Sequence, residues 1–344
     1  MSGIQQVLSL PAAIAGAIAA ALNIYALSAG ADFGGGVWDL FAFGPRRESQ
    51  KALIADAIAP IWEANHVWLI LVVVLLFTAF PPAFSRLMTL LHIPLSLMLL
   101  GIVLRGSAFT FRSYDSRRDS VQRRWGRIFA IASLGTPLLL GVILGTVSTG
   151  AVSAARLTQS STFAEAYVQP WLAPFPLGVG VLALALFAFL AAVYLTVEAT
   201  EEALRQDFRR RALWAGATSA FVAAIDLYLA RADAPLVWTA LTEGYLAMTF
   251  RVGATVAAIG AMASLWQGRY RIARIAAVIE VSLIVWGWAL GQFPFLVPPD
   301  LTVDNSAAPP ATLRLLAFAL ALGLALLIPS IRYLFKIFKP VIKS

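Results

Sequence analysis

Residues 66–82 read HVWLILVVVLLFTAFPP, and this stretch decides the class of fold. It contains no charged residue, and the largely apolar run reaches back to Ala55. A helix that crosses a bilayer needs about 20 mostly apolar residues, so Ala55–Phe80 is long enough to span a membrane. Two prolines then stop it, because proline has no backbone N–H to donate within a helix. We therefore expect a transmembrane helix that ends at Pro81-Pro82.

The composition of the whole chain supports the same class. Of 344 residues, 60% are hydrophobic and only 13% are charged, and the mean hydropathy is +0.80. Soluble domains carry roughly 45–50% apolar and about 25% charged residues, so a soluble enzyme and a disordered chain are both excluded. The absence of cysteine excludes disulfides, iron–sulfur clusters, thiolate metal sites and covalent c-type haem attachment. Any haem held by this chain would need one or both of its two histidines, or an unusual ligand.

Nine apolar segments of this kind can be counted along the chain. They predict an all-α multi-pass membrane protein, with the residues grouped into two four-helix bundles, two external loops and a final helix. The segments are Leu8–Ala29, Ala55–Phe80, Phe84–Gly106, Ile128–Thr149, Leu177–Val197, Ala212–Ala230, Leu246–Trp266, Ile272–Phe293 and Leu313–Leu334. The groups are residues 1–150 (helices 1–4), 151–169 (polar external loop), 170–293 (helices 5–8), 294–310 (Pro-rich external loop) and 311–344 (ninth helix and basic tail).

The basic residues test the helix count. Of the 26 Lys and Arg residues, twenty flank alternate connections or lie in the C-terminal tail, whereas only Arg86, Arg156 and Arg231 lie in the other connections. Cytoplasmic loops of membrane proteins are enriched in Lys and Arg, so the N-terminus is expected outside and the C-terminus in the cytoplasm. Because Met1–Gln6 has no basic residue, we expect the first apolar run to be a retained span and not a signal peptide.

A faint internal repeat relates the two halves. Tyr25–Asp32 resembles Tyr194–Glu201, and Lys51–Leu53 resembles Arg211–Leu213. Four helices separate the matched segments, so the two units would keep the same orientation. The pattern predicts a parallel pseudo-repeat of two four-helix bundles plus one peripheral helix. Chance similarity between apolar helices explains so short a match equally well.

Three charged residues fall inside or beside the first three spans. Counted at 1.5 Å per residue, Glu63 lies about 12 Å and Arg105 about 10 Å from the inner surface. Asp32 is expected at the cytoplasmic end of the first span, within Gly30–Gly36. The glycines of this segment allow close backbone approach and a tight turn. One interpretation is a hydrated proton path open to the cytoplasm, because buried carboxylates can relay protons. The other is a Glu63–Arg105 ion pair that only pins two helices together.

The string around Glu63 has further polar and aromatic residues. Trp62, Asn65 and Trp68 suggest a shaped cavity or a subunit contact, although the two indoles could equally be an interfacial anchor and ordinary packing. His66 and His92 differ in expected depth by about 7 Å, which is awkward for a shared haem and favours hydrogen-bonded structural histidines. Glu280, in the eighth segment, is the candidate acid of the second half.

Taken together, these motifs resemble subunit II of cytochrome bd-type quinol oxidases. The string Pro60–Leu69 is the most specific part of the resemblance. The matching strings, in order along nearly the whole chain, are Gly30–Gly36, Ile58–Leu69, Ala79–Pro81, Leu104–Gly106, Phe111-Arg112, Leu172–Phe175, Gln292–Thr302 and Ala308-Pro309.

The resemblance implies a complex in a bacterial cytoplasmic membrane. A haem-bearing subunit I would hold haems b and d, or b alone, together with the quinol site. Subunit II of this family is haem-poor or haem-free, so no haem is assigned to this chain, and His66 is its weak candidate ligand. A small single-helix accessory subunit is a further expected partner. Quinol would be oxidised and O2 reduced to water, electrogenically but without a proton pump. The quinone species is not indicated.

The resemblance also implies roles for individual residues. Glu63 would belong to the cytoplasmic proton path, Asp32 would lie near its opening, Arg105 would match the family arginine, and Trp68 would lie in the region of oxygen access. Glu63 stands where many members have Asp, His66 where Gln is frequent, and Ala31 where an aromatic is frequent. A secondary transporter and a purely structural membrane scaffold are the alternative functions that the sequence leaves open.

Overall fold

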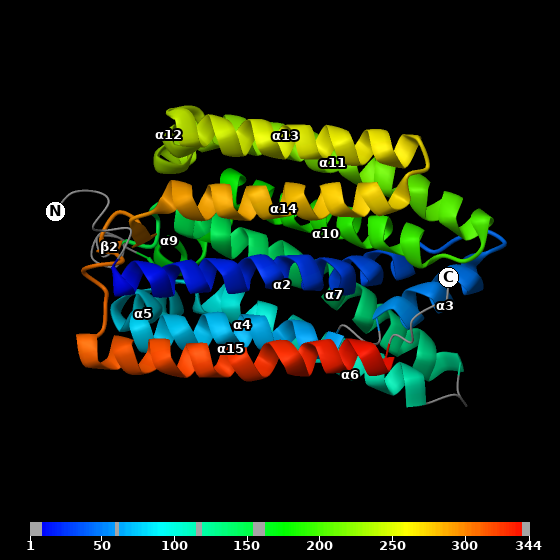
Figure 1. Cartoon of the computed structure of the whole chain (residues 1–344), viewed down its shortest axis with the longest axis horizontal. Coiled ribbons are helices and arrows are strands. Elements are labelled where there is room, and N and C mark those ends of the chain that lie inside the picture. Colours follow the sequence, from blue (N-terminus) through cyan, green and yellow to red (C-terminus); the bar gives the residue numbers. More distant parts are fainter. Residues whose placement is uncertain (1–8, 59–61, 115–118, 154–161, 339–344) are drawn as a thin grey trace.

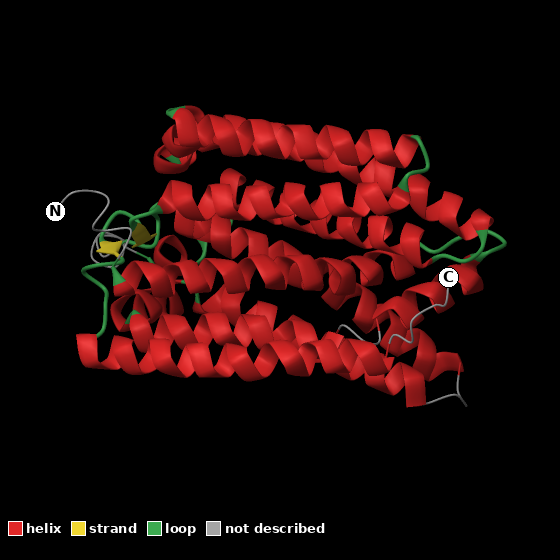
Figure 2. Ribbon diagram, in the orientation of Figure 1, coloured by secondary structure: helices red, strands yellow, loops and turns green. Residues whose placement is uncertain are grey.

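Long helices run side by side along one direction in the computed structural model, which describes residues 9–58, 62–114, 119–153 and 162–338 (Figure 1). A short hairpin of strands lies at the end of the bundle where the chain begins (Figure 2). The elements are α2 (Leu10–Leu40), α3 (Arg47–Ile58), α4 (Trp62–Ala79), α5 (Pro81–Leu90), α6 (His92–Tyr114), α7 (Asp119–Ser148), α9 (Phe163–Tyr167), the 3-10 helix η1 (Gln169–Trp171), α10 (Pro174–Glu198), α11 (Glu202–Asp233), α12 (Pro235–Thr242), α13 (Tyr245–Trp266), α14 (Tyr270–Gln292), β1 (Phe295–Val297), β2 (Leu301–Thr302) and α15 (Pro310–Phe338).

The helices confirm the predicted class of an all-α multi-pass membrane protein. Within the described ranges, eight helices are long and apolar enough to cross a membrane, and a ninth span arises if the bent pair α4–α5 is taken as one. Each of the nine predicted apolar segments overlaps one of these helices. The connections follow the predicted alternation, with α3 at one end of the bundle and α5, α9, α12 and the hairpin at the other (Figure 1).

The first helix is longer than predicted, because the glycine segment stays helical. The prediction placed a tight turn within Gly30–Gly36, but α2 continues to Leu40. Only the close approach that the glycines allow is confirmed. A Cβ at Gly34 would overlap the carbonyl oxygen of Phe187 on α10, and a Cβ at Gly36 would overlap the hydroxyl of Ser133 on α7. These glycines therefore let two neighbouring helices pack against the backbone of α2.

The predicted first residues of the second and third spans were also wrong. The segment expected to begin at Ala55 is divided between α3, which carries charged residues from its start, and α4, which begins at Trp62. The segment expected to begin at Phe84 is divided between α5 and α6, and the two parts of the α4–α5 pair are bent by 118°. Ser85, Arg86 and Thr89 make α5 a short amphipathic helix, which an apolar count alone does not separate from a span.

The same backbone corner ends α4 and α11. Phe80 has φ −134° and ψ 60°, and Ala234 has φ −138° and ψ 64°. Proline follows each of them and begins a short helix, α5 in one case and α12 in the other. The residue before proline is sterically kept out of the helical region, so each span ends there. The corners agree with the predicted repeat, which itself stays a prediction.

Helix α10 lies at the centre of the helix contacts. It packs against α11, α7, α2 and α14, while α6 packs on α7 and α13 packs on α14. The last helix, α15, touches α4 and α2 and remains at the edge, where many of its apolar residues are exposed. Helices that are apolar all round and exposed in the isolated chain are those expected to face lipid or another subunit.

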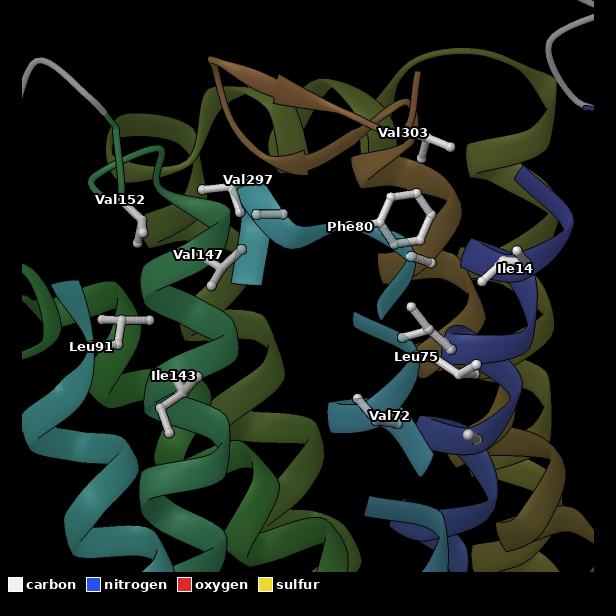
Figure 3. Packing of buried hydrophobic residues seen from close by; sticks show 14 of the residues in the cluster. Ile14, Val72, Leu75, Phe80, Leu91, Ile143, Val147, Val152, Val297 and Val303 are labelled. Atoms are coloured by element: carbon white, nitrogen blue, oxygen red, sulfur yellow. The ribbon is translucent and has the colours of Figure 1, made fainter. Parts of the chain in front are cut away.

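The largest apolar cluster joins α2, α4 and α7 to the connection that follows α14 (Figure 3). Val297, the last residue of β1, and Val303, which follows β2, are buried in the same cluster as Phe80, which follows the end of α4. The backbone N–H of Ala308 donates to the carbonyl of Ala79, which is the last residue of α4. The Pro-rich loop predicted at 294–310 is therefore a packed cap over the corner of α4.

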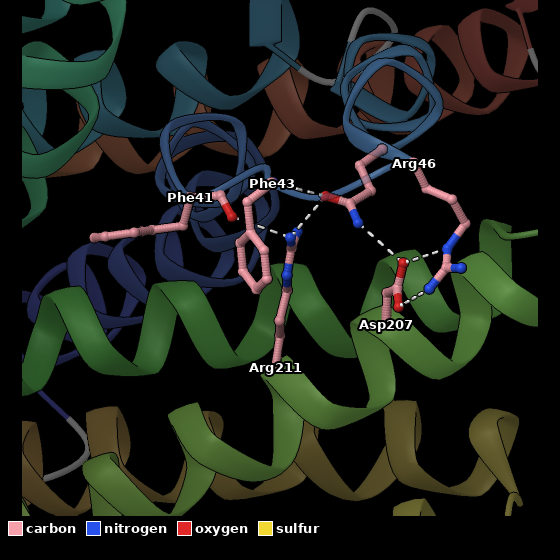
Figure 4. Close-up of polar contacts among 6 residues, drawn as sticks. Phe41, Phe43, Arg46, Asp207 and Arg211 are labelled. Atoms are coloured by element: carbon pink, nitrogen blue, oxygen red, sulfur yellow. Dashed lines mark hydrogen bonds and ion pairs between the residues drawn. The ribbon is translucent and has the colours of Figure 1, made fainter.

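At the opposite end, a polar network joins the α2–α3 connection to α11 (Figure 4). Arg46 donates to both oxygens of Asp207, at 2.9 and 2.6 Å, and Gln50 donates to the same carboxylate at 2.9 Å. Arg211 donates to the side chain of Gln50 and to the carbonyl of Phe41, just beyond the end of α2. Hydrogen bonding to Asp207 raises the pKa of Arg46 above its ordinary value. A cation at a helix C-terminus is favourable, so Arg211 stabilises the end of α2.

Candidate functional site

Two of the three predicted site charges form a buried ion pair between α2 and α6. The Arg105 guanidinium lies 2.5 Å from an Asp32 carboxylate oxygen, and it donates a second hydrogen bond of 2.8 Å to the backbone carbonyl of Asp32. Arg105 is 1% exposed and Asp32 is fully buried. Taking two charges out of water is costly, and the pair is stable only because further hydrogen bonds complete it.

Polar and aromatic side chains from two more helices complete the site. Asn65 on α4 donates to the other Asp32 oxygen at 2.7 Å, and Arg105 donates to the Ser133 hydroxyl on α7 at 3.1 Å. The rings of Phe33 and Phe129 lie 4.7 and 4.8 Å from the centre of the guanidinium group. The two rings stabilise the cation by cation–π attraction and shield it from solvent. We call Asp32, Asn65, Arg105 and Ser133 the α2–α6 polar cluster.

The α2–α6 polar cluster is enclosed, contrary to the expected open and hydrated arrangement. Asp32, Asn65 and Ser133 have no exposed surface, and Arg105 has almost none. Asp32 lies eight residues before the end of α2 and Arg105 nine residues before the end of α6. At 1.5 Å per residue, both lie about 12–14 Å from the ends of their helices. Asp32 is therefore deep inside the bundle and not at the end of the first helix.

Glu63 and Trp62 lie in the first turn of α4. Their side chains fall outside the described residues, so the predicted Glu63–Arg105 pair is untested, while the partner observed for Arg105 is Asp32. Helix α4 begins only three residues before Asn65, so it starts at the level of the α2–α6 polar cluster. Glu63 therefore lies about 3 Å along the helix axis from Asn65.

Asn65, Trp68 and His66 all lie on α4 next to α2. Because Asn65 is buried against Asp32, it does not reach the surface where a subunit contact would form. Trp68 is partly buried and packs on the cluster of Tyr25 and Phe33. The His66 ring lies 6.5 Å from the Tyr25 ring and 6.3 Å from the Phe33 ring, and its buried Nδ1 has no hydrogen-bond partner among the residues that the structure describes.

The two histidines lie much further apart along the bundle than the sequence predicted. His92 is the first residue of α6, with its Nδ1 2.9 Å from the carbonyl oxygen of Thr89 and its ring beside Tyr167. His66 lies on α4, thirteen residues before the helix ends at the Phe80 corner. The axial separation is therefore about 20 Å, not the expected 7 Å, because α6 begins at His92 and not at Phe84.

Glu280 belongs to a different part of the bundle. It is 8% exposed on α14, and its Oε2 has no hydrogen-bond partner. It is not in contact with the α2–α6 polar cluster through any hydrogen bond or ion pair recorded for the described residues. The structure thus buries an acid at the predicted position, and no ion pair joins it to a cationic side chain in the described ranges.

Sequence reasoning missed Ser133, the two phenylalanines and the network around Asp207. A polar residue in an otherwise apolar run is a signal that could have identified Ser133, because such residues need hydrogen-bond partners within a membrane. No comparable feature of the sequence indicates the hydrogen-bond partners of Arg211. They depend on the place where α2 ends, which the glycine segment obscured.

Comparison with known proteins identifies the family of the chain. The family described as cytochrome bd terminal oxidase subunit II matches residues 10–338. A putative cytochrome bd menaquinol oxidase subunit II of Bacillus subtilis is 25% identical over 92% of this chain and 91% of the relative. The cytochrome bd-I ubiquinol oxidase subunit 2 of Escherichia coli is 29% identical over 52% of this chain and 46% of the relative.

The fold is likewise similar to that of a solved protein. A chain of the bd oxidase from Geobacillus thermodenitrificans superposes with a TM-score of 0.76 at 21% identity, over 96% of this chain and 99% of the other. The family match spans every described helix from α2 to α15. The chain therefore belongs to the family of cytochrome bd terminal oxidase subunit II.

Proposed function

We propose that this chain is subunit II of a quinol:O2 oxidoreductase, that it supports a haem-bearing subunit I, and that its α2–α6 polar cluster belongs to the cytoplasmic proton path. Family membership and the buried Asp32–Arg105 pair carry this proposal. The haems b and d, or b alone, of subunit I supply the electron transfer and oxygen chemistry. Quinol and O2 are the substrates of the whole complex.

The proposed reaction is electrogenic without a pump. Oxidation of two quinols releases four electrons and four protons, and reduction of one O2 to two waters consumes the same numbers. If the quinol protons leave outside and the protons for water come from the cytoplasm, charge crosses the membrane in every turnover. This requires the N-terminus outside and the C-terminus in the cytoplasm, as the basic residues predict. A small accessory helix completes the proposed assembly.

Glu63 is the proposed first proton acceptor of this path. Helix α4 starts at the level of the α2–α6 polar cluster, whereas α2 and α6 extend beyond it. We therefore propose that protons enter the cluster at the beginning of α4. Asn65 Oδ1 and His66 Nδ1, which follow on the same helix, are buried polar atoms without a partner among the described residues. Ordered water commonly satisfies such atoms and conducts protons between them.

The Asp32–Arg105 pair has a positioning role in this proposal. It fixes the Asn65 side chain through the hydrogen bond to Asp32, and its own charges cancel. A proton that passes along α4 therefore does not meet an uncompensated buried charge, which would raise the barrier. Trp62 and Trp68 flank the same part of α4 and are proposed to border the route of oxygen or the contact with subunit I.

A reduced-minus-oxidised spectrum tests the assembly. The tagged chain, purified in mild detergent, is expected to show haem bands only when a larger subunit co-purifies with it. A chain that purifies alone, with no haem bands and with transport activity in vesicles, would instead support the alternative of a secondary transporter.

Glu63→Gln tests the proton path. Loss of the carboxyl is expected to lower oxygen consumption and proton uptake by the assembled complex about a hundredfold, the usual contribution of a positioned proton-transfer group. Glu48→Gln is the matched control, because Glu48 is exposed on α3 and should leave both rates unchanged. Unchanged proton uptake in Glu63→Gln, with normal haem content, would contradict the proposal.

A further inference from the structure

A second buried aspartate lies outside the proton path proposed above. Asp226 is on α11, one of the membrane-spanning helices, and only 5% of it is exposed. Neither of its carboxylate oxygens has a hydrogen-bond partner within the part of the chain that the structure describes. Asp32 is equally buried, but it is paired with Arg105 and accepts a hydrogen bond from Asn65. The same residue type is therefore buried in two opposite electrostatic settings.

The helix opposite Asp226 makes room for its carboxyl group. A Cβ at Gly178 on α10 would overlap Oδ1 of Asp226, so the carboxyl occupies the space that a side chain would need. Further along the same face, Ala230 of α11 packs with Phe175 of α10 and Val237 of α12 in an apolar cluster. The carboxyl thus lies in a notch of α10 with an apolar cluster beside it.

Among the described residues, no cationic group forms an ion pair with Asp226, and Arg251, the one arginine of α13, which also packs on α11, is exposed. Helix α10 carries no lysine or arginine from Pro174 to Glu198, and α12 carries no charged residue at all. Arg231, on α11 itself, is exposed. An ionised carboxylate without a partner is among the most costly groups to bury in an apolar medium, whereas the neutral acid loses far less on leaving water.

We propose that Asp226 and the notch at Gly178 form a proton-binding site, in which the assembled complex holds Asp226 as a neutral carboxylic acid. The ligand is a proton, and no residue of the α2–α6 polar cluster takes part. Asp233 lies seven residues further along α11, on the same face and about 10 Å nearer to the end of the helix. There it lines an open pocket of about 370 Å³ with Thr149 and Gln169. This pocket offers an aqueous space, one to two helix turns along α11, from which Asp226 can take its proton.

Chemical labelling of the unmodified complex tests the site. Dicyclohexylcarbodiimide adds to carboxylic acids in apolar surroundings and does not add to ion-paired carboxylates. Mass spectrometry of peptides from the labelled wild-type complex is expected to find the adduct on Asp226 and none on Asp32. Adducts absent from Asp226, under conditions that label a known membrane-embedded carboxylic acid in a reference protein, would overturn the proposal.

Infrared spectroscopy provides a second, independent readout. Asp226→Asn is expected to remove one carboxylic C=O band that shifts when the complex is transferred to D2O, with no loss of oxygen consumption. Asp233→Asn, at the pocket, should leave this band in place, and Glu280→Gln controls for the other buried acid. A spectrum of Asp226→Asn that loses a carboxylate band instead would show that Asp226 is ionised, contrary to the proposal.

Discussion

Arg105→Met is expected to lower the free energy of unfolding by about 3–5 kcal/mol, which is the usual cost of removing one partner of a buried ion pair. The substitution leaves the Asp32 carboxylate buried, with only the hydrogen bond from Asn65. Methionine keeps the apolar stem of the arginine but lacks the guanidinium group that lies between the two phenylalanine rings, so the loss combines the missing charge with lost packing. Chemical unfolding of the purified complex, followed through its haem absorbance, measures the change.

Two further variants test whether the unpaired charge causes the loss of stability. Arg127→Met removes an exposed arginine from α7 and should have little effect. The double variant Asp32→Asn with Arg105→Met removes both charges, and it should recover much of the lost stability, because replacing a whole buried pair is often nearly neutral. A double variant as unstable as Arg105→Met alone would show that the packing around the guanidinium, and not the unpaired carboxylate, causes the loss.

Gly34→Ala is expected to impair assembly of the chain. The new Cβ would overlap the backbone carbonyl of Phe187, which cannot move aside without shifting α10. Overpacking a tight contact typically costs about 1–3 kcal/mol, and a backbone contact at the centre of the bundle should reach the upper end of that range. The yield of folded complex and its unfolding temperature in detergent measure the effect.

Gly16→Ala is the matched control on the same helix. No atom outside its own helix lies within 4 Å of the Cβ position at Gly16, so the substitution should be tolerated. Alanine also favours a helix by up to about 1 kcal/mol over glycine, and the unfolding temperature should stay the same or rise. Equal losses in both variants would show that glycine is needed for flexibility of α2 and not for its contact with α10.

The sequence predicted the order of the spans because apolar length is a property of each segment alone. It predicted nine spans, and the described residues contain eight, or nine if the bent α4–α5 pair is taken as one. The prediction of helix bounds was wrong where the local structure depends on packing against neighbouring helices. Gly30–Gly36 predicted a turn, yet the segment is helical, because α10 and α7 pack directly on its backbone. The short helices α3 and α5 were merged into spans because hydropathy does not distinguish a helix along the bundle end from one that crosses it.

The sequence predicted which charged residues belong to the candidate site, but it did not predict which of them form an ion pair. Asp32 and Arg105 were identified because charges are rare within apolar runs, and the structure brings them together. Depth counted from the wrong helix boundaries matched Arg105 with Glu63, although Asp32 is the partner observed. Asp226 lies inside a predicted span and was passed over. Its significance comes from the lack of a partner, which only the arrangement of α10 and α11 shows.

The repeated corner at Phe80 and Ala234 has a consequence for ancestry. Fifteen residues before each corner lies a buried polar residue, Asn65 in one case and Ser219 in the other. Asn65 binds the carboxylate of Asp32, whereas Ser219 donates only to Ala215 of its own helix. Gene duplication followed by divergence would leave this pattern, with one copy keeping the charges and the other free to lose them while both preserve the bend.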